Sequence, residues 1–338
     1  MPKDFSDLMI AGMSKESVGL KCVQIKWWLS TGCPQLDYAI RPGHPPEKQG
    51  LPNGKWTELL GPEGSGKTAW ALRVAASIQQ IGGHVIYLAA ESGTFEEYIA
   101  LNRVSMDPEY FTPGHPFSLE SCVQAIENIV VEYHDQERPI LIIVDSISGL
   151  EAADYTLDAQ SFKKSTPQAA GAKAMHRFCR RGQSFYLQGA PIWGIVIRHE
   201  TGSPRAFDFG IHTTHGKALD YYTWVRIKCS KKAFDDKYGG KEMGAFLSAQ
   251  VVKSKVGPNY GSASAPFYAS HGWDPGTEQL HYLLDCKAFP EPSSGRFTFN
   301  GTNYTRYQLR DMYYNDASVK ATVDSMVQTC LANGGKLL

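Results

Sequence analysis

The chain has 338 residues, enough for one large domain and one smaller companion, and its 42% hydrophobic and 20% charged residues fit a globular protein. Its 34 Lys and Arg residues balance 34 Asp and Glu residues, which excludes nucleic-acid binding through a global positive charge and requires local basic clusters instead. No apolar run approaches about 20 residues and no secretory signal opens the sequence, so we expect a cytoplasmic protein without membrane contact.

The first 29 residues contain apolar side chains at helical spacing, namely Phe5, Leu8, Met9 and Met13. This spacing predicts an N-terminal helical segment, which either packs on its own domain or docks on a neighbouring subunit. A stretch rich in proline and glycine follows at 41–55 and predicts a surface loop before the first central strand.

From residue 56 onward, apolar runs alternate with helical patterns. The expected strands are 56–60, 84–90, 139–145 and 191–197, and the expected helices are 68–80, 118–133 and 169–188. Buried strands separated by crossover helices predict an α/β fold with a mostly parallel central sheet covered on both faces. Two further strands, at 221–230 and 245–255, have no long helix between them and predict an antiparallel extension of the sheet.

The composition changes near Asp274, where a short region rich in small and aromatic residues begins. A helix is expected near its end, at 318–331. We therefore expect three parts: an N-terminal helical or oligomerisation segment at 1–29, a core at 30–273, and a small α+β C-terminal domain at 274–338.

A glycine-rich turn lies between the first expected strand and the helix that follows, and it matches G-x-x-x-x-G-K-[ST] in full. Its glycines let backbone N–H groups turn around a phosphate, and the helix adds its positive dipole end. The lysine reaches the β- and γ-phosphates and the threonine hydroxyl ligates Mg²⁺, which predicts a site for ATP and Mg²⁺. The expected contact residues are Gly61, Pro62, Glu63, Gly64, Ser65, Gly66, Lys67, Thr68 and Ala69.

Two carboxylates end neighbouring apolar strands and point to the same site. Asp145 follows five apolar residues and is expected to hold the Mg²⁺ shell, although a strand-end aspartate is often only a helix cap. Glu91 is expected to align and deprotonate the attacking water, or again to act as a cap. Tyr98 lies in the next helix, where it either stacks on adenine or packs in the core.

The order of these segments resembles the RecA-type strand-exchange recombinases of bacteria and their phages. The likeness covers about residues 30 to 330. The segments that carry it are "STGCPQLDYAI" at 30–40, "LPNGKWTELLGPEGSGKT" at 51–68, "VDSISGL" at 144–150, "HGKALDYYTWVRI" at 215–227, "VVKSKVGP" at 251–258 and "YLLDCKAF" at 282–289.

The resemblance implies roles for individual residues. It implies that Glu91 is the catalytic glutamate and that Tyr98 stacks on adenine. It also implies that Lys253 and Lys255 reach the ATP site of the adjacent subunit, where added cations stabilise transition-state charge. Tyr221 matches an aromatic residue at the subunit interface.

Two DNA-facing loops follow by position, at about 154–167 and 200–214. Long connections at the carboxyl edge of a sheet are usually functional or mobile. Their basic and aromatic residues suit sequence-independent binding of single strands, whereas any one of them is alternatively a solvated charge or a loop anchor. The expected DNA contacts are Phe162, Lys163, Lys164, Arg205, Phe207 and Phe209.

Several features depart from the bacterial pattern. The chain before Ser30 is shorter, the acidic tail is missing, and His199 stands where bacterial members usually have glutamine. These departures favour a divergent member that a phage encodes. We expect His199 either to contact the γ-phosphate and couple it to the second DNA loop, or only to cap the strand and face that loop.

The resemblance implies a DNA-dependent ATPase that forms helical filaments on single-stranded DNA and catalyses homologous pairing and strand exchange with duplex DNA. Two alternatives remain open from the residues. One is a ring-shaped motor such as a helicase, and the other is a regulatory relative that binds without turnover.

Overall fold

The structure is a computed structural model that describes residues 25–90, 96–133, 137–150, 167–182, 191–200, 218–233, 244–290 and 296–333. Its strands are β1 (Trp28–Leu29), β2 (Leu51–Pro52), β3 (Trp56–Gly61), β4 (His84–Ala89), β5 (Phe111–Gly114), β6 (Ile140–Asp145), β7 (Ile192–His199), β8 (Val225–Ala233), β9 (Gly244–Ser254), β10 (Ser262–Tyr268), β11 (Gly272–Trp273), β12 (Arg296–Phe299) and β13 (Thr302–Thr305). Its helices are α2 (Pro34–Ile40), η2 (Pro46–Lys48), α3 (Lys67–Gln80), α4 (Glu96–Leu101), α5 (Leu119–Tyr133), η3 (Ile147–Gly149), α7 (Pro167–Gly182), α9 (Ala218–Tyr222), α10 (Pro275–Asp285), α11 (Arg306–Asn315) and α12 (Ala317–Ala332).

The largest sheet in the described ranges has nine strands in the order β11-β10-β9-β8-β3-β7-β6-β4-β5. The pairs from β8 through β3, β7, β6 and β4 to β5 are parallel, whereas β8, β9, β10 and β11 pair antiparallel. The expected α/β fold with a mostly parallel sheet is therefore confirmed. The antiparallel extension begins one strand later than predicted, because β8 joins β3 in parallel and only β9 reverses direction.

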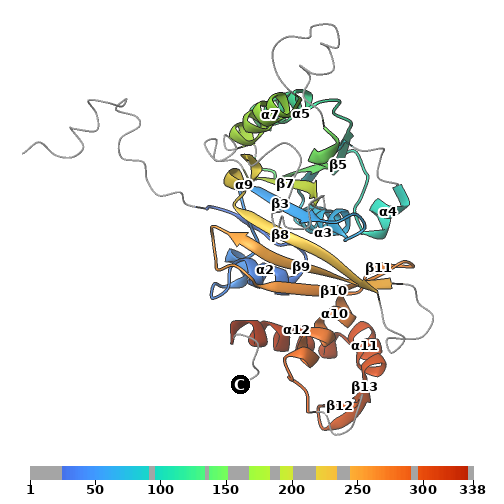
Figure 1. Cartoon of the computed structure of the whole chain (residues 1–338). Coiled ribbons are helices and arrows are strands. Elements are labelled where there is room, and N and C mark those ends of the chain that lie inside the picture. The colour runs from blue at the N-terminus through green and yellow to red at the C-terminus, as the bar shows by residue number, and fades with distance from the viewer. Residues whose placement is uncertain are drawn as a thin grey trace, which may run out of the picture.

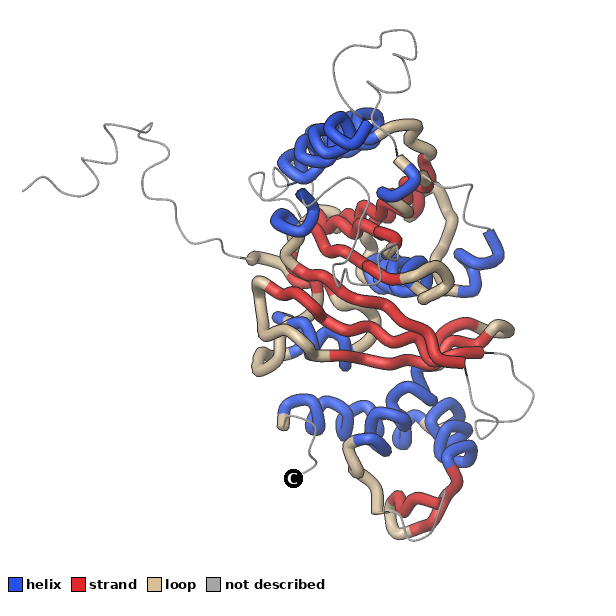
Figure 2. Tube along the Cα trace, in the orientation of Figure 1, coloured by secondary structure: helices blue, strands red, loops and turns tan. Residues whose placement is uncertain are grey.

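Helices cover both faces of the sheet, as the layers in Figures 1 and 2 show. On one face, α3 packs through buried Trp70, Val74 and Ile78 against the apolar side chains of the central strands. On the other face, α5 and α7 contribute Ile126 and Phe178 to a second cluster. The central strands are therefore buried on both sides, which explains their continuous apolar runs.

Local features of the structure differ from the prediction at α9 and β5. Tyr221 and Tyr222, predicted to open a strand, end helix α9, and the strand begins only at Val225. The alternation of buried and less buried residues that marks a strand also starts there, since Val225, Ile227 and Cys229 are buried. Strand β5 was not predicted, because it is four residues long and contains Pro113, which is tolerated at a sheet edge.

The residues after Asp274 have a core of their own. Leu280, Leu283, Leu309, Val323 and Val327 are buried together in a cluster that helices α10, α11 and α12 form. The Asp274 side chain caps α10 by accepting a hydrogen bond from the Thr277 N–H. We propose that this point divides the core from a separate C-terminal domain, and Figure 1 shows these helices and β12-β13 below the sheet.

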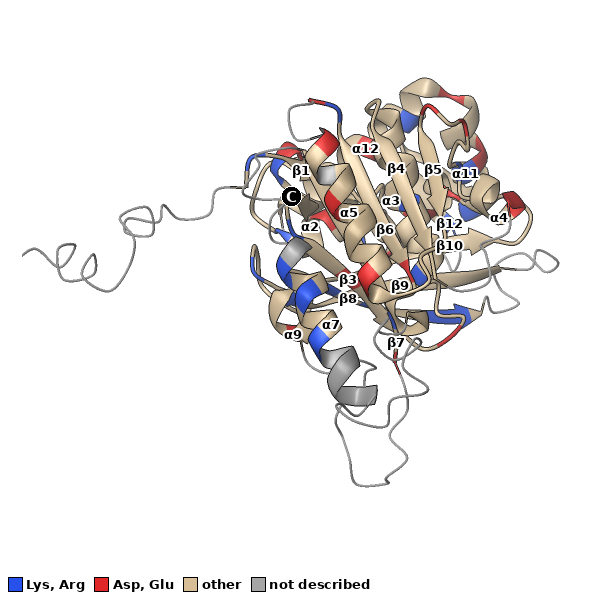
Figure 3. Ribbon diagram, turned by 90° about the horizontal axis from the view of Figure 1, so that it is seen from above, with Lys and Arg blue, Asp and Glu red and all other residues tan. Residues whose placement is uncertain are grey.

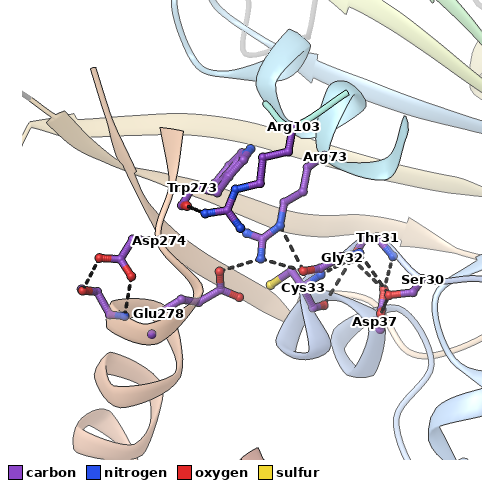
Figure 4. A network of polar contacts seen from close by, with 12 residues as sticks. Ser30, Thr31, Gly32, Cys33, Asp37, Arg73, Arg103, Trp273, Asp274 and Glu278 are labelled. Carbon is purple, nitrogen blue, oxygen red and sulfur yellow. Dashed lines mark hydrogen bonds and ion pairs between the residues drawn. The ribbon is translucent and has the colours of Figure 1, made fainter. Parts of the chain in front are cut away.

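A buried ion pair joins α3 to α10 at this junction (Figure 4). Arg73 Nη2 lies 2.6 Å from Glu278 Oε2 and 2.7 Å from the Gly32 carbonyl oxygen. The side chains of Arg73 and Glu278 are 7% and 1% exposed. The guanidinium also lies over the Trp273 ring, with 4.6 Å to its centroid. The helix after the glycine-rich turn is thus tied directly to the C-terminal helices.

The segment at 30–40 forms a second polar anchor at the same place. Ser30 Oγ and Thr31 Oγ1 donate to the buried Asp37 carboxylate at 2.5 and 2.6 Å. Burial raises the pKa of Asp37, and these hydrogen bonds limit the rise. The Ser-Thr-Gly segment is therefore tied to α2 through Asp37.

Within the described part of the chain, no helix is both long and apolar enough to cross a membrane.

Candidate functional site

The glycine-rich turn lies where the resemblance requires it, between the end of β3 and the start of α3. Gly66 precedes the helix at φ 88°, in the left-handed region that favours glycine. A Cβ atom at Gly66 would approach Leu247 Cδ1 at 2.8 Å, and one at Gly61 would meet the Cys229 carbonyl oxygen at 2.5 Å. Both positions need glycine because β8 and β9 pack closely against the turn.

Lys67 is the first residue of α3 and is buried. Its Nζ donates to the Gly61 carbonyl at 2.9 Å and to the Pro62 carbonyl at 2.7 Å. The ammonium group is therefore held inside the curve of the turn. A cation in this position offsets the charge of a phosphate that the surrounding N–H groups bind.

Thr68 and Asp145 come together from α3 and β6. Thr68 Oγ1 donates to Asp145 Oδ2 at 2.9 Å, and the same oxygen accepts a 2.6 Å hydrogen bond from the Tyr87 hydroxyl of β4. A hydroxyl beside a carboxylate is the type of oxygen donor set that Mg²⁺ binds together with substrate phosphates. These residues fit the Mg²⁺ and ATP that the turn predicts.

A cavity of about 750 Å³ opens beside the turn. It brings together Tyr98 of α4, Asp145 of β6 and His199 of β7 with the turn itself. The described lining is Glu63, Gly64, Ser65, Gly66, Lys67, Thr68, Tyr98, Leu101, Asp145, His199, Lys231, Gly244, Ala245, Leu247, Phe267 and Ala269. Its size and its mixture of polar and apolar walls suit a small-molecule ligand.

Tyr98 packs at the edge of the core and also lines the cavity, while its stacking on adenine stays a prediction. Its ring packs on Phe267 with centroids 6.1 Å apart, at the edge of the apolar core, and both residues line the cavity. Burial raises the pKa of Tyr98, so the phenol stays neutral. Two aromatic rings on one wall provide a surface for a flat ring system such as a base.

His199 ends β7 beside the glycine-rich turn. It pairs with Gly61 in the parallel ladder, and its backbone N–H donates to Ser148 Oγ at 3.1 Å. The next residue, Glu200, donates its N–H to the Gly61 carbonyl at 3.1 Å and pairs with Lys228 at 3.0 Å. The start of the second expected DNA loop is therefore attached to the phosphate-binding turn.

Lys253 and Lys255 lie away from the cavity of their own chain. Ala245 lines the cavity at the start of β9, and Lys253 lies eight residues further along the same extended strand, which is about 26 Å. Lys253 Nζ donates to the Asp220 carbonyl, and Lys255 Nζ donates to the Tyr221 carbonyl at 3.2 Å. Both lysines therefore contact α9, on which Tyr221 is 71% exposed.

Several predicted site residues lie outside the described residues. They are Glu91, Phe162, Lys163, Lys164, Arg205, Phe207 and Phe209. Their proposed roles stay predictions.

The structure also adds residues that the motifs did not indicate. Tyr87, Lys231 and Phe267 contact Asp145 or the cavity, from strands far away in the sequence. Tyr87 stands in an apolar run that reads as core, and Lys231 stands among the exposed residues at the end of β8. Only the sheet order brings them to the site.

Comparison with known proteins agrees with this geometry. Residues 14–274 match the RecA N-terminal domain family, and this match ends at the residue that caps α10. The chain is 29% identical to Protein RecA of Chlorobaculum tepidum over 320 residues, covering 90% of this chain and 83% of that protein. It is 26% identical to Protein RecA of Synechocystis sp. over 325 residues, covering 90% and 82%. The chain therefore belongs to the RecA family, as a divergent member.

Proposed function

We propose that the protein is an ATP-dependent homologous recombinase. It assembles on single-stranded DNA as a filament, pairs that strand with homologous duplex DNA, and hydrolyses ATP in a DNA-stimulated manner. The observation that carries the proposal is the Thr68–Asp145 pair beside Lys67, in a cavity that also contains His199. This arrangement joins a complete phosphate-binding turn to the strand that leads into the second expected DNA loop.

Different residues of the cavity would bind the phosphates, the Mg²⁺ and the base of ATP. The backbone of the glycine-rich turn and Lys67 would bind the phosphates, while Thr68 and Asp145 would hold Mg²⁺. Bound Mg²⁺ neutralises phosphate charge and orients the phosphates. Tyr87 holds Asp145 in place, Tyr98 and Phe267 offer a surface to the base, and Glu91 would position and deprotonate the attacking water.

Hydrolysis requires a second subunit in this proposal. Lys253 lies about eight strand residues from the cavity of its own chain and Lys255 follows the end of the strand, but both contact helix α9, whose Tyr221 is exposed. A homo-oligomer that places α9 beside a neighbour's cavity brings both ammonium groups to that neighbour's phosphates. ATP then binds the subunits together, and the two lysines stabilise transition-state charge.

DNA binding is assigned to the two loops and to the helix after the first of them. Lys173, Arg177 and Arg180 are exposed along one face of α7, at i, i+4 and i+7. Figure 3 shows the basic residues of α7 beside acidic residues of α5. Because Arg177 and Arg180 share a groove with Glu120 and Glu127 of α5, DNA binding is assigned chiefly to the loops, where Lys163 and Lys164 would neutralise phosphates.

Electron microscopy combined with hydrolysis assays tests the proposal. With single-stranded DNA and a non-hydrolysable ATP analogue we expect helical filaments, and with ATP we expect hydrolysis that rises when DNA is added. Closed rings would favour a motor. Absence of DNA-stimulated hydrolysis in a folded, ATP-binding protein would favour a regulatory role. Either result would contradict the proposed function.

We propose the cytoplasm of a bacterium as the setting of this function, and a phage-encoded origin as a further prediction.

A further inference from the structure

Four charged side chains meet on the face of the sheet that α7 and α9 cover. Arg198 Nη2 of β7 lies 2.5 Å from Glu58 Oε1 of β3 and 2.7 Å from Asp220 Oδ1 of α9. Arg226 of β8 reaches the same two carboxylates, with Nε to Glu58 Oε2 and Nη2 to Asp220 Oδ1, both at 2.5 Å. We call these four residues the charge quartet. Its two positive and two negative charges cancel.

Burial is uneven within the quartet. The side chains of Glu58 and Arg198 are 0% and 1% exposed, while those of Arg226 and Asp220 are 15% and 33% exposed. Burial raises the pKa of the Asp220 carboxyl, but the hydrogen bond from Arg198 and the charges of both arginines outweigh it and lower that pKa. Asp220 is therefore a charged residue at the solvent edge of a buried ionic cluster.

The quartet connects two parts of the site that lie at opposite ends of the second DNA loop. Arg198 is the residue before His199, which lines the nucleotide cavity. Asp220 lies in α9, which follows residues 201–217 in the chain. The Asp220 carbonyl accepts a hydrogen bond from Lys253, and the Tyr221 carbonyl accepts one from Lys255.

Helix α9 depends on these contacts for its position. It has only five residues, and so short a helix is not stable without tertiary contacts. Asp220 supplies its ion pairs to the sheet, and Lys253 and Lys255 hold carbonyl groups of its last turn. Ala218 and Leu219 also anchor the helix in the core, so we expect a change in the Asp220 pairs to shift the end of α9 whose carbonyls the two lysines contact.

We propose that Asp220, held by Arg198 and Arg226, is a positioning residue that keeps α9, Lys253 and Lys255 where the two lysines act on the next subunit's nucleotide. The inference rests on the proposed function, because it deepens the role of the shared site. Asp220 itself does not touch the nucleotide. It acts through the lysines. A subunit without Asp220 therefore cannot supply well-placed lysines to its neighbour, but its own cavity can still hydrolyse ATP.

A cluster that only stabilises the sheet would behave differently. Its loss would lower stability, and the choice of partner subunit in a mixture would make no difference to the rate of ATP hydrolysis. The Arg73–Glu278 pair is a matched control, since it is buried, joins its partners at 2.6 Å and lies near Trp273, on the other face of the sheet (Figure 4). Glu278→Gln removes one carboxylate charge from a buried pair, as Asp220→Asn removes one from the partly buried quartet, and it does not touch α9.

The test measures DNA-stimulated ATP hydrolysis in mixtures of two variants. Glu91→Gln subunits have a defective cavity but intact lysines, and Lys253→Ala/Lys255→Ala subunits have the reverse defect. Their mixture is the reference, and it should hydrolyse more ATP than the sum of the separate proteins. Energy transfer between labelled subunits verifies that each pair co-assembles. Failure of this reference mixture would overturn the shared site, and the present inference with it.

With the reference working, Asp220→Asn is examined alone and in both mixtures. Alone, its kcat should fall about 10-fold or more, because displacements of about 1 Å can cost 100-fold. Mixed with Glu91→Gln subunits it should be rescued, and mixed with Lys253→Ala/Lys255→Ala subunits it should not. The Glu278→Gln protein should lose thermal stability but keep its kcat at a temperature where it is folded.

Three results would overturn the inference while leaving the shared site intact. The first is rescue of Asp220→Asn by the Lys253→Ala/Lys255→Ala subunits, which would place the defect in its own cavity. The second is no rescue by either partner, and the third is a kcat no lower than that of Glu278→Gln. If Asp220→Asn does not fold, Arg198→Lys is carried through the same mixtures, because it keeps the charge but loses the guanidinium geometry.

Discussion

The Thr68 hydroxyl donates a 2.9 Å hydrogen bond to the Asp145 carboxylate, across 77 residues of sequence. Tyr87 donates to the same carboxylate oxygen at 2.6 Å, so α3, β6 and β4 converge on one atom. These two hydrogen bonds hold the carboxylate beside the first turn of α3. Changes to Thr68, Tyr87 or Asp145 should therefore alter the Mg²⁺ concentration that hydrolysis requires.

Asp145→Asn should lower kcat roughly 100-fold and raise the Mg²⁺ concentration needed for half-maximal rate, because the amide keeps the shape but removes the negative charge. Tyr87→Phe loses one hydrogen bond, a net loss of about 1 kcal/mol, and should shift the same curve less than about 10-fold. Initial rates over a Mg²⁺ titration measure both. Identical curves for wild type and Asp145→Asn would remove Asp145 from the metal site.

His199→Ala should bind ATP as the wild type does but lose the increase in hydrolysis that DNA causes. The reason is its position, paired with Gly61 and lining the cavity just before the second proposed DNA loop. His199→Gln should retain the stimulation, since an amide also donates hydrogen bonds. ATP binding is measured by nucleotide fluorescence, and hydrolysis with and without DNA. Full stimulation in the alanine variant would refute the coupling role.

Salt dependence separates phosphate contacts from base contacts in the two loops. Each phosphate contact on single-stranded DNA contributes a slope of roughly −0.7 to the plot of log affinity against log salt. Lys163→Ala/Lys164→Ala should therefore flatten that plot by about 1.4. Phe207→Ala should weaken affinity and leave the slope nearly unchanged. If the slopes respond the other way round, the division into phosphate and base contacts is wrong.

Lys55 should make stability depend on pH above neutrality. Burial, aided by the charge of Lys255, lowers the pKa of Lys55 to about 8 from its ordinary 10.5. Both ammonium groups lie over the Trp224 ring, at 4.5 and 5.8 Å from its centroid. The unfolded chain then binds more protons than the folded protein between about pH 8 and 10.5, so stability rises with pH across that window.

Lys55→Met should reduce the increase in the free energy of unfolding across this pH window by on the order of 1 to 2 kcal/mol, after allowance for solvent screening. Urea unfolding at several pH values measures the free energy of unfolding for both proteins. Parallel curves for wild type and Lys55→Met would show that Lys55 is not the titrating group.

The sequence predicted the central sheet well because its parallel strands are buried on both faces and read as apolar runs. It missed β10, in which Ser262, Ala263, Ser264 and Ala265 are too small to give a clear apolar signal. It also assigned Tyr221 and Tyr222 to a strand, because their aromatic side chains favour strands locally. The short helix α9 is held by tertiary contacts, namely the burial of Ala218 and Leu219 and the ion pairs of Asp220, which no local pattern shows.

In the candidate site, too, the sequence predicted some residues and missed others. Lys67, Thr68 and Asp145 were predictable, because the phosphate chemistry demands these residue types at a fixed spacing or at a strand end. Tyr87 and Phe267 were not, since they reach the site only through the order of strands in the sheet. The charge quartet was also hidden, because Glu58 and Arg198 are single charges within apolar strands and acquire meaning only as neighbours.

A strand-exchange assay tests the central claim most directly. Circular single-stranded DNA and a linear duplex are incubated with the protein, ATP and Mg²⁺, and joined molecules are measured by gel electrophoresis. The account predicts joined molecules with a homologous duplex, none with a heterologous duplex, and none with folded Lys67→Ala protein. If the wild type hydrolyses ATP on single-stranded DNA yet joins no homologous duplex, or separates duplex strands regardless of homology, the proposed recombinase function is contradicted.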